Sequence, residues 1–341
     1  MKSSTDHDAP ADVFARIGVA GAGAWGTALA LCARAAGRDV ALWAHESEVA
    51  RSLAEGGGNP LYLPGVSIPP MTASADMGVL ADCDAILMAA PAQHMRATLR
   101  GVAPGLRAGT PVALCSKGIE RGTLKLMTDI LREEAPGARP AVLSGPSFAS
   151  DVARGLPTAV TLACEGRALA ESWTASIGRP HFRIYWSDDL TGAEVGGAIK
   201  NVLAIACGVC EGMGLGRSAH AALIARGFAE MTRLGIALGG RPETLSGLCG
   251  LGDLVLTCSS SQSRNMSFGM ELGRGRSPGA ILAARTAVTE GAETAPALIA
   301  LGARLGVELP ICEVVLDMIE GRLDAKSAVD RLLNRPMGGE G

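Results

Sequence analysis

Aromatic residues are scarce in this sequence, and it lacks the charge pattern of a nucleic-acid-binding protein. Phe, Trp and Tyr make up 3% of the 341 residues, so Ala, Val, Ile and Leu must fill the core. The formal net charge is −3. Lys and Arg form no basic stripe and do not alternate with aromatic residues. Both observations argue against nucleic acid as a partner.

A disulfide framework is also missing from the cysteine pattern. The nine cysteines are odd in number and irregular in spacing, and several lie inside apolar, strand-like runs. This pattern favours a reduced, cytoplasmic compartment. Cys207 and Cys210 form a CxxC, but it lies in an apolar segment with no second pair at the spacing of a zinc site. We therefore expect buried structural thiols and no metal site.

No segment has the pattern of a signal peptide or a membrane span. The first residues are polar and acidic without an apolar stretch, so 1–15 is predicted to be a flexible tail. The apolar run 202–210 is too short and too interrupted by glycine to cross a bilayer. The last residues, 335–341, are predicted to be loose. We expect a cytoplasmic protein that does not span a membrane.

The length exceeds what one compact core usually holds, which predicts two domains. Up to about residue 190, short apolar runs alternate with amphipathic segments, and most runs are continuous rather than alternating. This indicates an α/β domain over 16–191, with a parallel, doubly wound, Rossmann-type sheet covered on both faces. From 192 to 334 only helical patterns occur, which predicts an all-α domain. The predicted strands are 16–21, 39–44, 84–91, 111–118, 140–146, 158–164 and 182–186.

A glycine motif follows the first predicted strand. Gly21-x-Gly23-x-x-Gly26 is followed by a helical segment and then by a second strand. The first glycine permits a tight turn, the second lets the backbone approach a pyrophosphate, and the third lets the helix pack on the strand. The order of these elements favours dinucleotide binding over an ordinary turn.

The end of the second predicted strand bears on the choice of nucleotide. It reads Trp43-Ala44-His45-Glu46, without an acid at the strand tip to hold a ribose hydroxyl. His45 could lie beside a 2′-phosphate, and Glu46 could still reach the ribose. The pattern indicates that NADP is tolerated and leaves a preference for it open, without excluding NAD. The alternative is that His45 is a solvated loop residue.

Lys200 stands in an apolar helical segment, next to Asn201. Its side chain either extends along the helix to the surface or faces a closed reaction site. Gly196, Gly197 and Ala204 share its helix face, which leaves that face bare, as a flat ring or a small substrate requires. Burial and a nearby cation would then lower the pKa of Lys200.

Three further segments supply candidate polar groups. Lys117 and the segment 144–148 each follow a predicted strand, at the sheet edge where open α/β folds bind ligands. Asp253, if adjacent to Lys200, would fix its ammonium and oppose the lowering of its pKa. The string Ser263-Arg264-Asn265 precedes a helix and suits a phosphate. The alternative is a helix cap with a solvated arginine.

Several strings run in the order of a known family over residues 16–330: GAGAWGTALA, NPLYLPG, SKGIE, SGPSFASDVARGLPTAV, GGAIKNVLAIACG, ARGFAEM, GLGDLVLTC, SRN and VTEGAETA. In them the chain resembles the bacterial NAD(P)-dependent glycerol-3-phosphate dehydrogenases. The resemblance implies a Rossmann-type domain, a helical domain like that of 6-phosphogluconate dehydrogenase, and a homodimer. It also implies hydride transfer between sn-glycerol 3-phosphate and dihydroxyacetone phosphate with NAD(P)H, for phospholipid synthesis.

The resemblance also implies roles for single residues, with Lys200 as the general acid/base. The expected substrate contacts are Lys117, Gly145, Ser147, Lys200, Asp253, Ser263, Arg264 and Asn265. The expected cofactor contacts, beside Gly21, Gly23 and Gly26, are Ala24, Trp25, His45, Lys117, Ala149, Arg264, Val288 and Glu290. Ser218, His220 and Met266 depart from the family pattern. Two other hypotheses are a reductase of the same fold for a different small hydroxy acid and a cofactor-binding sensor without turnover.

Overall fold

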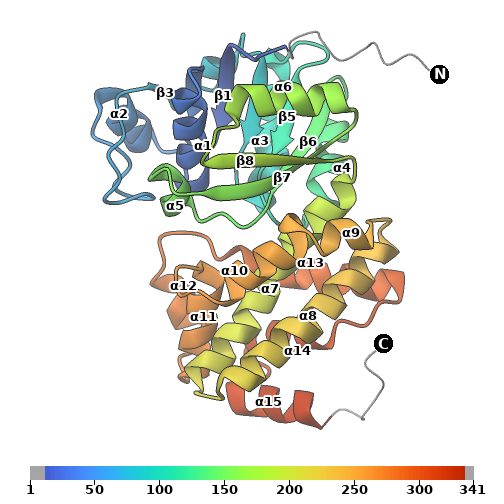
Figure 1. Ribbon diagram of the computed structural model, residues 1–341. Coiled ribbons are helices and arrows are strands. Elements are labelled where there is room, and N and C mark those ends of the chain that lie inside the picture. The colour runs from blue at the N-terminus through green and yellow to red at the C-terminus, as the bar shows by residue number, and fades with distance from the viewer. Residues whose placement is uncertain (1–11, 335–341) are drawn as a thin grey trace, which may run out of the picture.

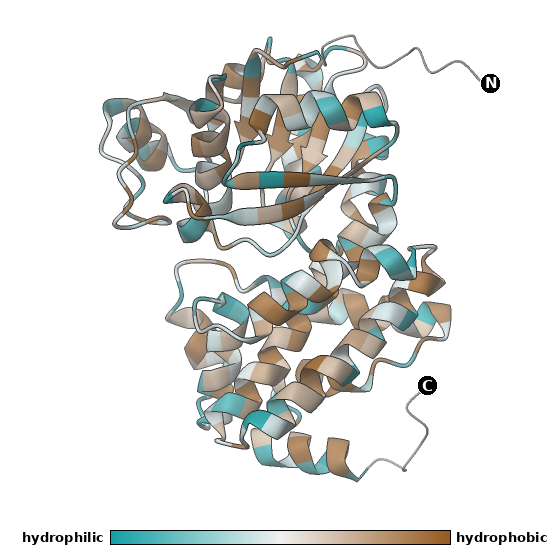
Figure 2. Ribbon diagram, in the orientation of Figure 1, coloured by the Kyte–Doolittle hydropathy of each residue, from teal (hydrophilic) through white to brown (hydrophobic). Residues whose placement is uncertain are grey.

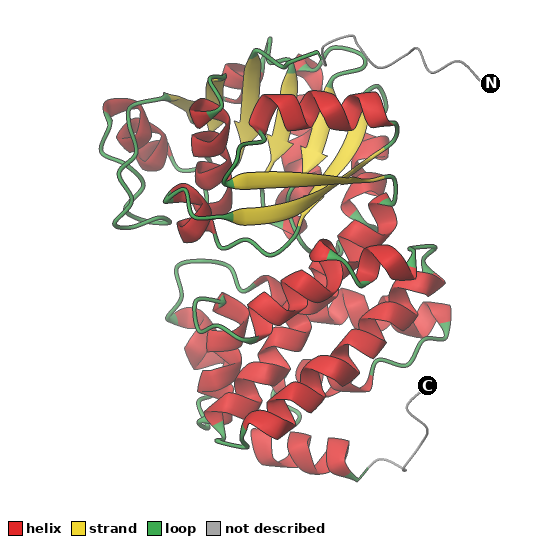
Figure 3. Cartoon of the chain, viewed as in Figure 1, coloured by secondary structure: helices red, strands yellow, loops and turns green. Residues whose placement is uncertain are grey.

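The computed structural model describes residues 12–334. Its first half contains one eight-stranded sheet, and its second half is helical (Figure 1; Figure 3). The sheet has the strand order β3-β2-β1-β4-β5-β6-β7-β8. The strands are β1 Arg16–Ala20, β2 Asp39–Trp43, β3 Thr72–Ser74, β4 Ala85–Met88, β5 Pro111–Leu114, β6 Arg139–Ser144, β7 Thr158–Cys164 and β8 Phe182–Ser187.

The doubly wound α/β arrangement is confirmed, but the expectation of a wholly parallel sheet is wrong at one pair. β7 runs antiparallel to β6, with Ser144 opposite Thr161, while β8 is again parallel to β7. The connection from β6 to β7 contains only the short helix α5, Ala149–Ala153. A parallel crossover is usually made by a longer helix packed on the sheet. The strand β3, which is only three residues long, was not predicted.

Helices cover both faces of the sheet, as its continuous apolar strands require (Figure 1). One core cluster joins α1, α2 and α6 to the sheet, and another joins α3 and α4 to it. The helices of this half are α1 Ala24–Ala35, α2 Ser47–Glu55, α3 Met95–Val102, α4 Met127–Glu134, α5 and α6 Arg167–Ile177, with 3-10 turns η1 Met77–Leu80, η2 Ala92–His94 and η3 Ala103–Gly105.

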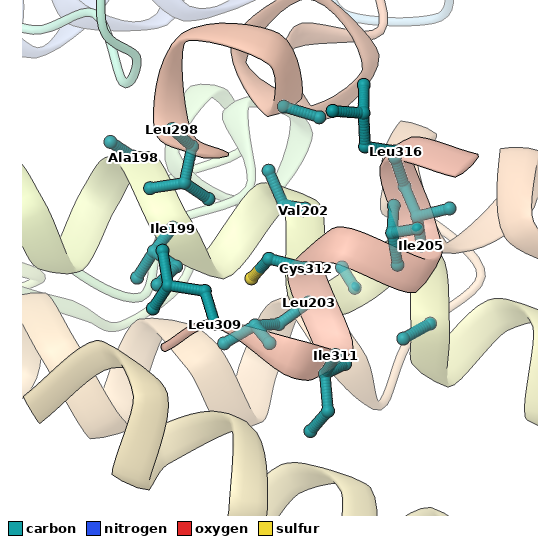
Figure 4. Close-up of a cluster of buried hydrophobic side chains, with 14 of the residues drawn as sticks. Ala198, Ile199, Val202, Leu203, Ile205, Leu298, Leu309, Ile311, Cys312 and Leu316 are labelled. Atoms are coloured by element: carbon teal, nitrogen blue, oxygen red, sulfur yellow. The ribbon is translucent and has the colours of Figure 1, made fainter. Parts of the chain in front are cut away.

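The helical half is built around α7, Leu190–Gly212. In Figure 4, Leu298 of α13, Leu309 just before α14 and Leu316 of α14 lie against the apolar side chains of α7. The other elements are α8 Arg217–Ala237, α9 Pro242–Leu245, the π-helical turn η4 Leu248–Gly252, α10 Asp253–Cys258, α11 Arg264–Gly273, α12 Pro278–Ala283, α13 Glu290–Leu305, α14 Pro310–Ile319 and α15 Ala325–Leu333.

Within residues 12–334, α7 alone is long and apolar enough to cross a membrane, and its apolar stretch is wholly buried inside the protein. This is the burial of a core helix, surrounded by other helices. The surrounding helices carry both hydrophobic and hydrophilic residues along their length (Figure 2), as helices with one buried and one exposed face do.

Glycines let α7 and α11 touch through their backbones. A Cβ on Gly208 would overlap the carbonyl oxygen of Met266, and one on Gly269 would overlap the carbonyl oxygen of Ile205. No side chain separates the two helices at this contact. The start of α11 is therefore held at a fixed place beside α7.

Glu194 in the first turns of α7 ties this helix to the sheet-containing half. Its Oε1 accepts a hydrogen bond from the backbone N–H of Thr128 (2.9 Å), and its Oε2 accepts one from the Thr128 hydroxyl (2.6 Å). Thr128 lies in the first turn of α4. A small apolar cluster of Leu190 and Ala193 with Val142 of β6 adds to this junction.

Most of the predicted tail 1–15 and the whole of 335–341 lie outside the described residues. Near the start of the described chain, the Phe14 N–H donates to Ser176 Oγ (2.9 Å), and the Phe14 ring packs edge-on against Trp173. The nine cysteines are free and buried. The expectation of buried thiols at Cys207 and Cys210 is thus confirmed.

Candidate active site

The glycine motif forms a tight turn between β1 and α1. Gly21 has a φ of +116°, which glycine adopts without strain, and its N–H donates to Trp43 O at 3.0 Å. A Cβ on Gly26 would overlap the carbonyl oxygen of Gly21, whereas Gly23 faces open space. Ala24 and the partly exposed Trp25 begin α1, whose N-terminal amides have no side-chain cap. This is the geometry that a pyrophosphate requires.

The segment after β2 presents one imidazole and one carboxylate. His45 is exposed, and its ring stands edge-on to Trp43 at 6.2 Å between centroids. Glu46 is the residue before α2, and its Oε1 accepts a hydrogen bond from the Tyr62 hydroxyl at 2.8 Å. The carboxylate is thus held in place, while the imidazole faces solvent.

Lys200 points into the protein and not to its surface. The residue is 6% exposed, which rules out the extended, solvated conformation. Its ammonium donates to Asp253 Oδ1 and to Thr257 Oγ1, both at 2.7 Å. Lys117, from the loop after β5, donates to the other oxygen of Asp253 at 2.6 Å and to Gly145 O at 3.2 Å. The structure therefore brings Lys117, Lys200 and Asp253 together.

The glycines beside Lys200 have a different purpose from the one expected. A Cβ on Gly196 would lie 2.6 Å from the carbonyl oxygen of Cys249, and one on Gly197 would lie 3.2 Å from Lys117 Cγ. The bare helix face is filled by the η4 backbone and by the stem of Lys117. The interpretation that it leaves room for a ring or a substrate is wrong, because protein atoms occupy that space.

Burial and charge set the protonation of the cluster. Burial, reinforced by the positive charge of Lys117, lowers the pKa of Lys200 to about 8, although Asp253 opposes the shift. Burial alone would raise the pKa of Asp253, but the two lysines outweigh it and hold that pKa below its ordinary value. Asp253 is therefore an ionised carboxylate, and the neighbouring Lys200 amine can gain or lose a proton near neutral pH.

The start of α11 is joined to the cluster through two amides. Asn265 Nδ2 donates to Asn201 Oδ1 at 3.0 Å, and Asn265 Oδ1 accepts the N–H of Gly291 at 2.9 Å. Asn201 Nδ2 in turn donates to Lys117 O at 3.4 Å. Ser263 caps α11 by accepting the Met266 N–H at 3.2 Å, as the alternative interpretation held, and Arg264 is exposed.

Of the remaining predicted residues, Ser147 lies beside Gly145 and Ala149 lies in the helix that packs on α1. Ser147 Oγ donates to Gly145 O at 3.0 Å, and Ala149 begins α5, which packs against α1. A cavity of about 190 Å³ lies between the segment after β4 and the start of α13. Its lining is Pro91, Ala92, Gln93, His94, Val288, Glu290, Glu293 and Thr294.

Glu290 lies within electrostatic reach of the lysine cluster. Burial raises the pKa of this carboxyl, while the charges of Arg264, Lys117 and Lys200 work in the opposite direction. Val288, two residues earlier, is 38% exposed. The start of α13 thus faces both the cavity and the positive charges.

Family models match most of the chain. One described as the N-terminus of NAD-dependent glycerol-3-phosphate dehydrogenase matches residues 16–170, and one described as its C-terminus matches 189–330. The chain belongs to the NAD(P)-dependent glycerol-3-phosphate dehydrogenase family. It is 57% identical to glycerol-3-phosphate dehydrogenase [NAD(P)+] of Caulobacter vibrioides and 56% identical to that of Maricaulis maris. These alignments cover 95% of this chain and 98% and 97% of the two relatives.

Solved structures agree with this membership of the glycerol-3-phosphate dehydrogenase family. Glycerol-3-phosphate dehydrogenase from Coxiella burnetii superposes with a TM-score of 0.90 at 37% identity, covering 94% of this chain and 99% of that one. A ketopantoate reductase from Ralstonia eutropha superposes with a TM-score of 0.58 at 17% identity, covering 92% and 99%. The second likeness shows the shared fold alone.

Two polar residues that contact the predicted site were not predicted from the sequence. Thr257 contacts the ammonium of Lys200, and it follows Asp253 by one helical turn, a spacing that places both on one face. Asn59 Nδ2 donates to Ala22 O at 2.8 Å and to Thr27 Oγ1 at 2.9 Å, which supports the glycine turn from outside. The spacing after Asp253 was a usable signal for Thr257, whereas nothing near Asn59 indicated its contact.

Proposed function

We propose that this protein catalyses the reversible transfer of hydride between NAD(P)H and dihydroxyacetone phosphate, which gives sn-glycerol 3-phosphate for phospholipid synthesis. The observation that carries the proposal is the buried Lys200, held with Lys117 on one carboxylate and poised to titrate near pH 8. Family membership supports the same reaction. The protein side of the chemistry follows from these groups.

The residues of the glycine turn fit a dinucleotide. Gly23 leaves open space for the pyrophosphate at the N-terminus of α1, while Gly21 and Gly26 shape the turn by packing closely against protein atoms. When bound, the nicotinamide supplies the hydride. We assign the remaining cofactor contacts to Ala24 and Trp25 at the start of α1 and to Val288 and Glu290 at the cavity of about 190 Å³. The assignment also includes His45, Lys117, Ala149 and Arg264.

Lys200 is the general acid in the reducing direction. Its ammonium gives a proton to the oxygen on C2 of the substrate as negative charge grows there, and its amine takes that proton back in the oxidising direction. Lys117 adds positive charge near the same oxygen. Asp253 holds both ammonium groups in place, at 2.6 and 2.7 Å. Because Lys200 is buried, this charge develops away from water.

The substrate phosphate lies at the start of α11. Arg264 is exposed there, and the N-terminus of a helix favours an anion. Ser263 and Asn265 flank it in sequence, and we assign Gly145 and Ser147, from the loop after β6, to the same substrate. Fixing the phosphate fixes C2 against the hydride donor, which removes the entropy cost of orientation from the chemical step.

Residues 16–191 form the cofactor domain in this proposal, and 192–334 form the substrate domain. The enzyme acts as a cytoplasmic homodimer on a small phosphorylated substrate, without a nucleic-acid partner. A competing function is a reductase of the same fold for another small hydroxy acid. It accounts for the glycine turn and for Lys200, but it leaves Arg264 at a helix start without a purpose.

The test is oxidation of NADH and NADPH with dihydroxyacetone phosphate, followed by absorbance. Lys200→Ala is expected to lose turnover while it still binds cofactor, and Lys326→Ala, an exposed lysine on α15, should match wild type. If wild type binds NADPH but does not reduce this substrate, while it reduces another 2-keto or 3-keto acid, the competing function is correct. Binding without any turnover would identify a sensor.

A further inference from the structure

We propose that Arg285 is a positioning residue for the substrate phosphate, because it holds the main chain of Arg264 in place. The inference rests on the proposed function, in which Arg264 anchors that phosphate. It adds a residue that acts through Arg264 and does not itself touch the substrate. Arg285 lies between α12 and α13, 21 residues beyond Arg264 in the chain.

Two hydrogen bonds hold the carbonyl oxygen of Arg264, in the first turn of α11. Arg285 Nη1 donates to this oxygen at 2.6 Å, and the Ser267 hydroxyl donates to it at 3.1 Å. Neither contact uses the guanidinium of Arg264, and that residue is exposed. The guanidinium is thus free to bind an anion, while the peptide that carries it is fixed.

Arg285 is itself held by several groups on α11. Its Nη2 donates to Ser267 Oγ at 3.1 Å and pairs with Glu271 Oε1 at 3.0 Å. Its guanidinium carbon lies 5.6 Å from the ring centroid of the buried Phe268, a distance at which a cation is attracted to an aromatic face. The side chain is only 17% exposed. Arg285 is therefore a fixed clamp on the start of α11.

Arg285 also closes a short loop at the cavity of about 190 Å³. The segment 286–290 runs from Arg285 to the start of α13 and contributes to the lining of this cavity. Beyond its far end, the N–H of Gly291 donates to Asn265 Oδ1 at 2.9 Å. The segment is thus bonded at both ends to neighbouring residues of α11, Arg264 and Asn265. The phosphate anchor and this wall of the cavity are held together as one unit.

Loss of the clamp should weaken substrate binding and leave the chemical step nearly unchanged. Without Arg285, Arg264 still binds the phosphate, but its peptide must be ordered when the substrate binds, and this ordering costs affinity. Once bound, the phosphate is held as before, so the loss falls on KM and not on kcat. The proton donor Lys200 keeps its own contacts, with Asp253 and Thr257.

The test compares wild type with Arg285→Met, which keeps an unbranched apolar stem and removes the guanidinium. The dissociation constant of sn-glycerol 3-phosphate is measured by calorimetry with NADH present, where no hydride can be transferred because both ligands are reduced. Arg285→Met should raise this constant about tenfold. KM for dihydroxyacetone phosphate should rise by a similar factor, and kcat should change by less than about twofold.

Arg276→Met is the matched control, because Arg276 pairs with the other oxygen of the same Glu271 carboxylate. Its affinity for sn-glycerol 3-phosphate should equal that of wild type. Ser267→Ala removes the longer of the two hydrogen bonds to Arg264 O and should raise the dissociation constant about threefold, which tests the clamp even if Arg285→Met does not fold.

Dihydroxyacetone, which lacks the phosphate, separates positioning of the phosphate from a general structural defect. Its kcat/KM should be the same in wild type and in Arg285→Met. An equal loss for dihydroxyacetone and dihydroxyacetone phosphate would overturn the proposal. An unchanged dissociation constant of sn-glycerol 3-phosphate in Arg285→Met, or in Ser267→Ala if only that variant folds, would overturn it as well.

The same measurements separate this inference from the proposed function. If wild type does not reduce dihydroxyacetone phosphate but Arg285→Met weakens binding of sn-glycerol 3-phosphate, the proposed function fails and the role of Arg285 stands. If wild type reduces this substrate and Arg285→Met matches it, the role of Arg285 alone fails. A wild type that neither reduces dihydroxyacetone phosphate nor binds sn-glycerol 3-phosphate would overturn both.

Discussion

Lys117 and Lys200 donate to opposite oxygens of one buried carboxylate, Asp253, at 2.6 and 2.7 Å. The first lysine follows β5 of the sheet, and the second lies in the middle of α7. Two lysines thus share one carboxylate, which under the proposed function leaves positive charge available for the oxygen of the substrate.

The pH dependence should have opposite signs in the two reaction directions. Reduction needs the protonated Lys200, so kcat/KM for dihydroxyacetone phosphate should fall as the pH rises through about 8. Oxidation needs the neutral amine, so kcat/KM for sn-glycerol 3-phosphate should rise over the same range. Initial rates between pH 6 and 10 would show this. If kcat/KM changes in the same direction with pH for both substrates, Lys200 is not the titrating group.

Thr257→Val should lower kcat about tenfold and leave cofactor affinity unchanged. The variant keeps the shape of the side chain but removes the hydroxyl that accepts from Lys200 at 2.7 Å. Loss of this hydrogen bond should raise the activation free energy by about 1.4 kcal/mol, because Lys200 is then held less firmly. Thr232→Val is the matched control, because that hydroxyl bonds only the carbonyl of Phe228 in its own helix. An equal loss of activity in both variants would assign no special role to Thr257.

Gly208→Ala should destabilise the fold by about 1–3 kcal/mol or more, since its Cβ would overlap Met266 O at the contact of α7 with α11. Gly279→Ala, in the exposed start of α12 with open space around it, should instead stabilise by up to about 1 kcal/mol. Urea unfolding measures both. If Gly208→Ala is neutral, the backbone contact between α7 and α11 is not as close as described.

Glu194 should make stability fall as the pH rises from 4.5 to 7. Burial raises its pKa from 4.5 to about 7, with Asp129 reinforcing the shift and Thr128 and Arg132 opposing it. Over this range the folded protein keeps a proton that the unfolded chain has lost, so rising pH favours unfolding. The free energy of unfolding of wild type relative to Glu194→Gln should therefore fall by about 3 kcal/mol. Parallel curves for the two proteins would show that Glu194 is ionised throughout.

Local patterns in the sequence were enough to predict the two classes of structure and the glycine turn. Each depends on residues within about one strand and one helix, where periodicity and turn chemistry act directly. The strand β3 was missed because three residues carry no periodicity, and the direction of β7 depends on how a short connection folds back. Such features are decided by packing between distant segments.

The lysine cluster was likewise predicted only as far as local sequence allows. A cation in an apolar helix indicated that Lys200 is unusual, and the structure confirms its burial. Its partner Asp253 lies far away in the sequence, so their contact was expected only on the condition that they are adjacent. The glycines beside Lys200 were misinterpreted, because a single helix does not reveal that the η4 backbone and Lys117 occupy the space they leave.

The glycine contact between α7 and α11 also bears on the length of substrate that the proposed function allows. Lys200 belongs to one helix and Arg264 to the other, and the two backbones meet without side chains between them. Under the proposed function, the backbones that carry the proton donor and the phosphate anchor are therefore held at a fixed separation. A keto phosphate one carbon longer is expected to be a poorer substrate, because the two side chains can adjust but the two helices cannot move apart or together.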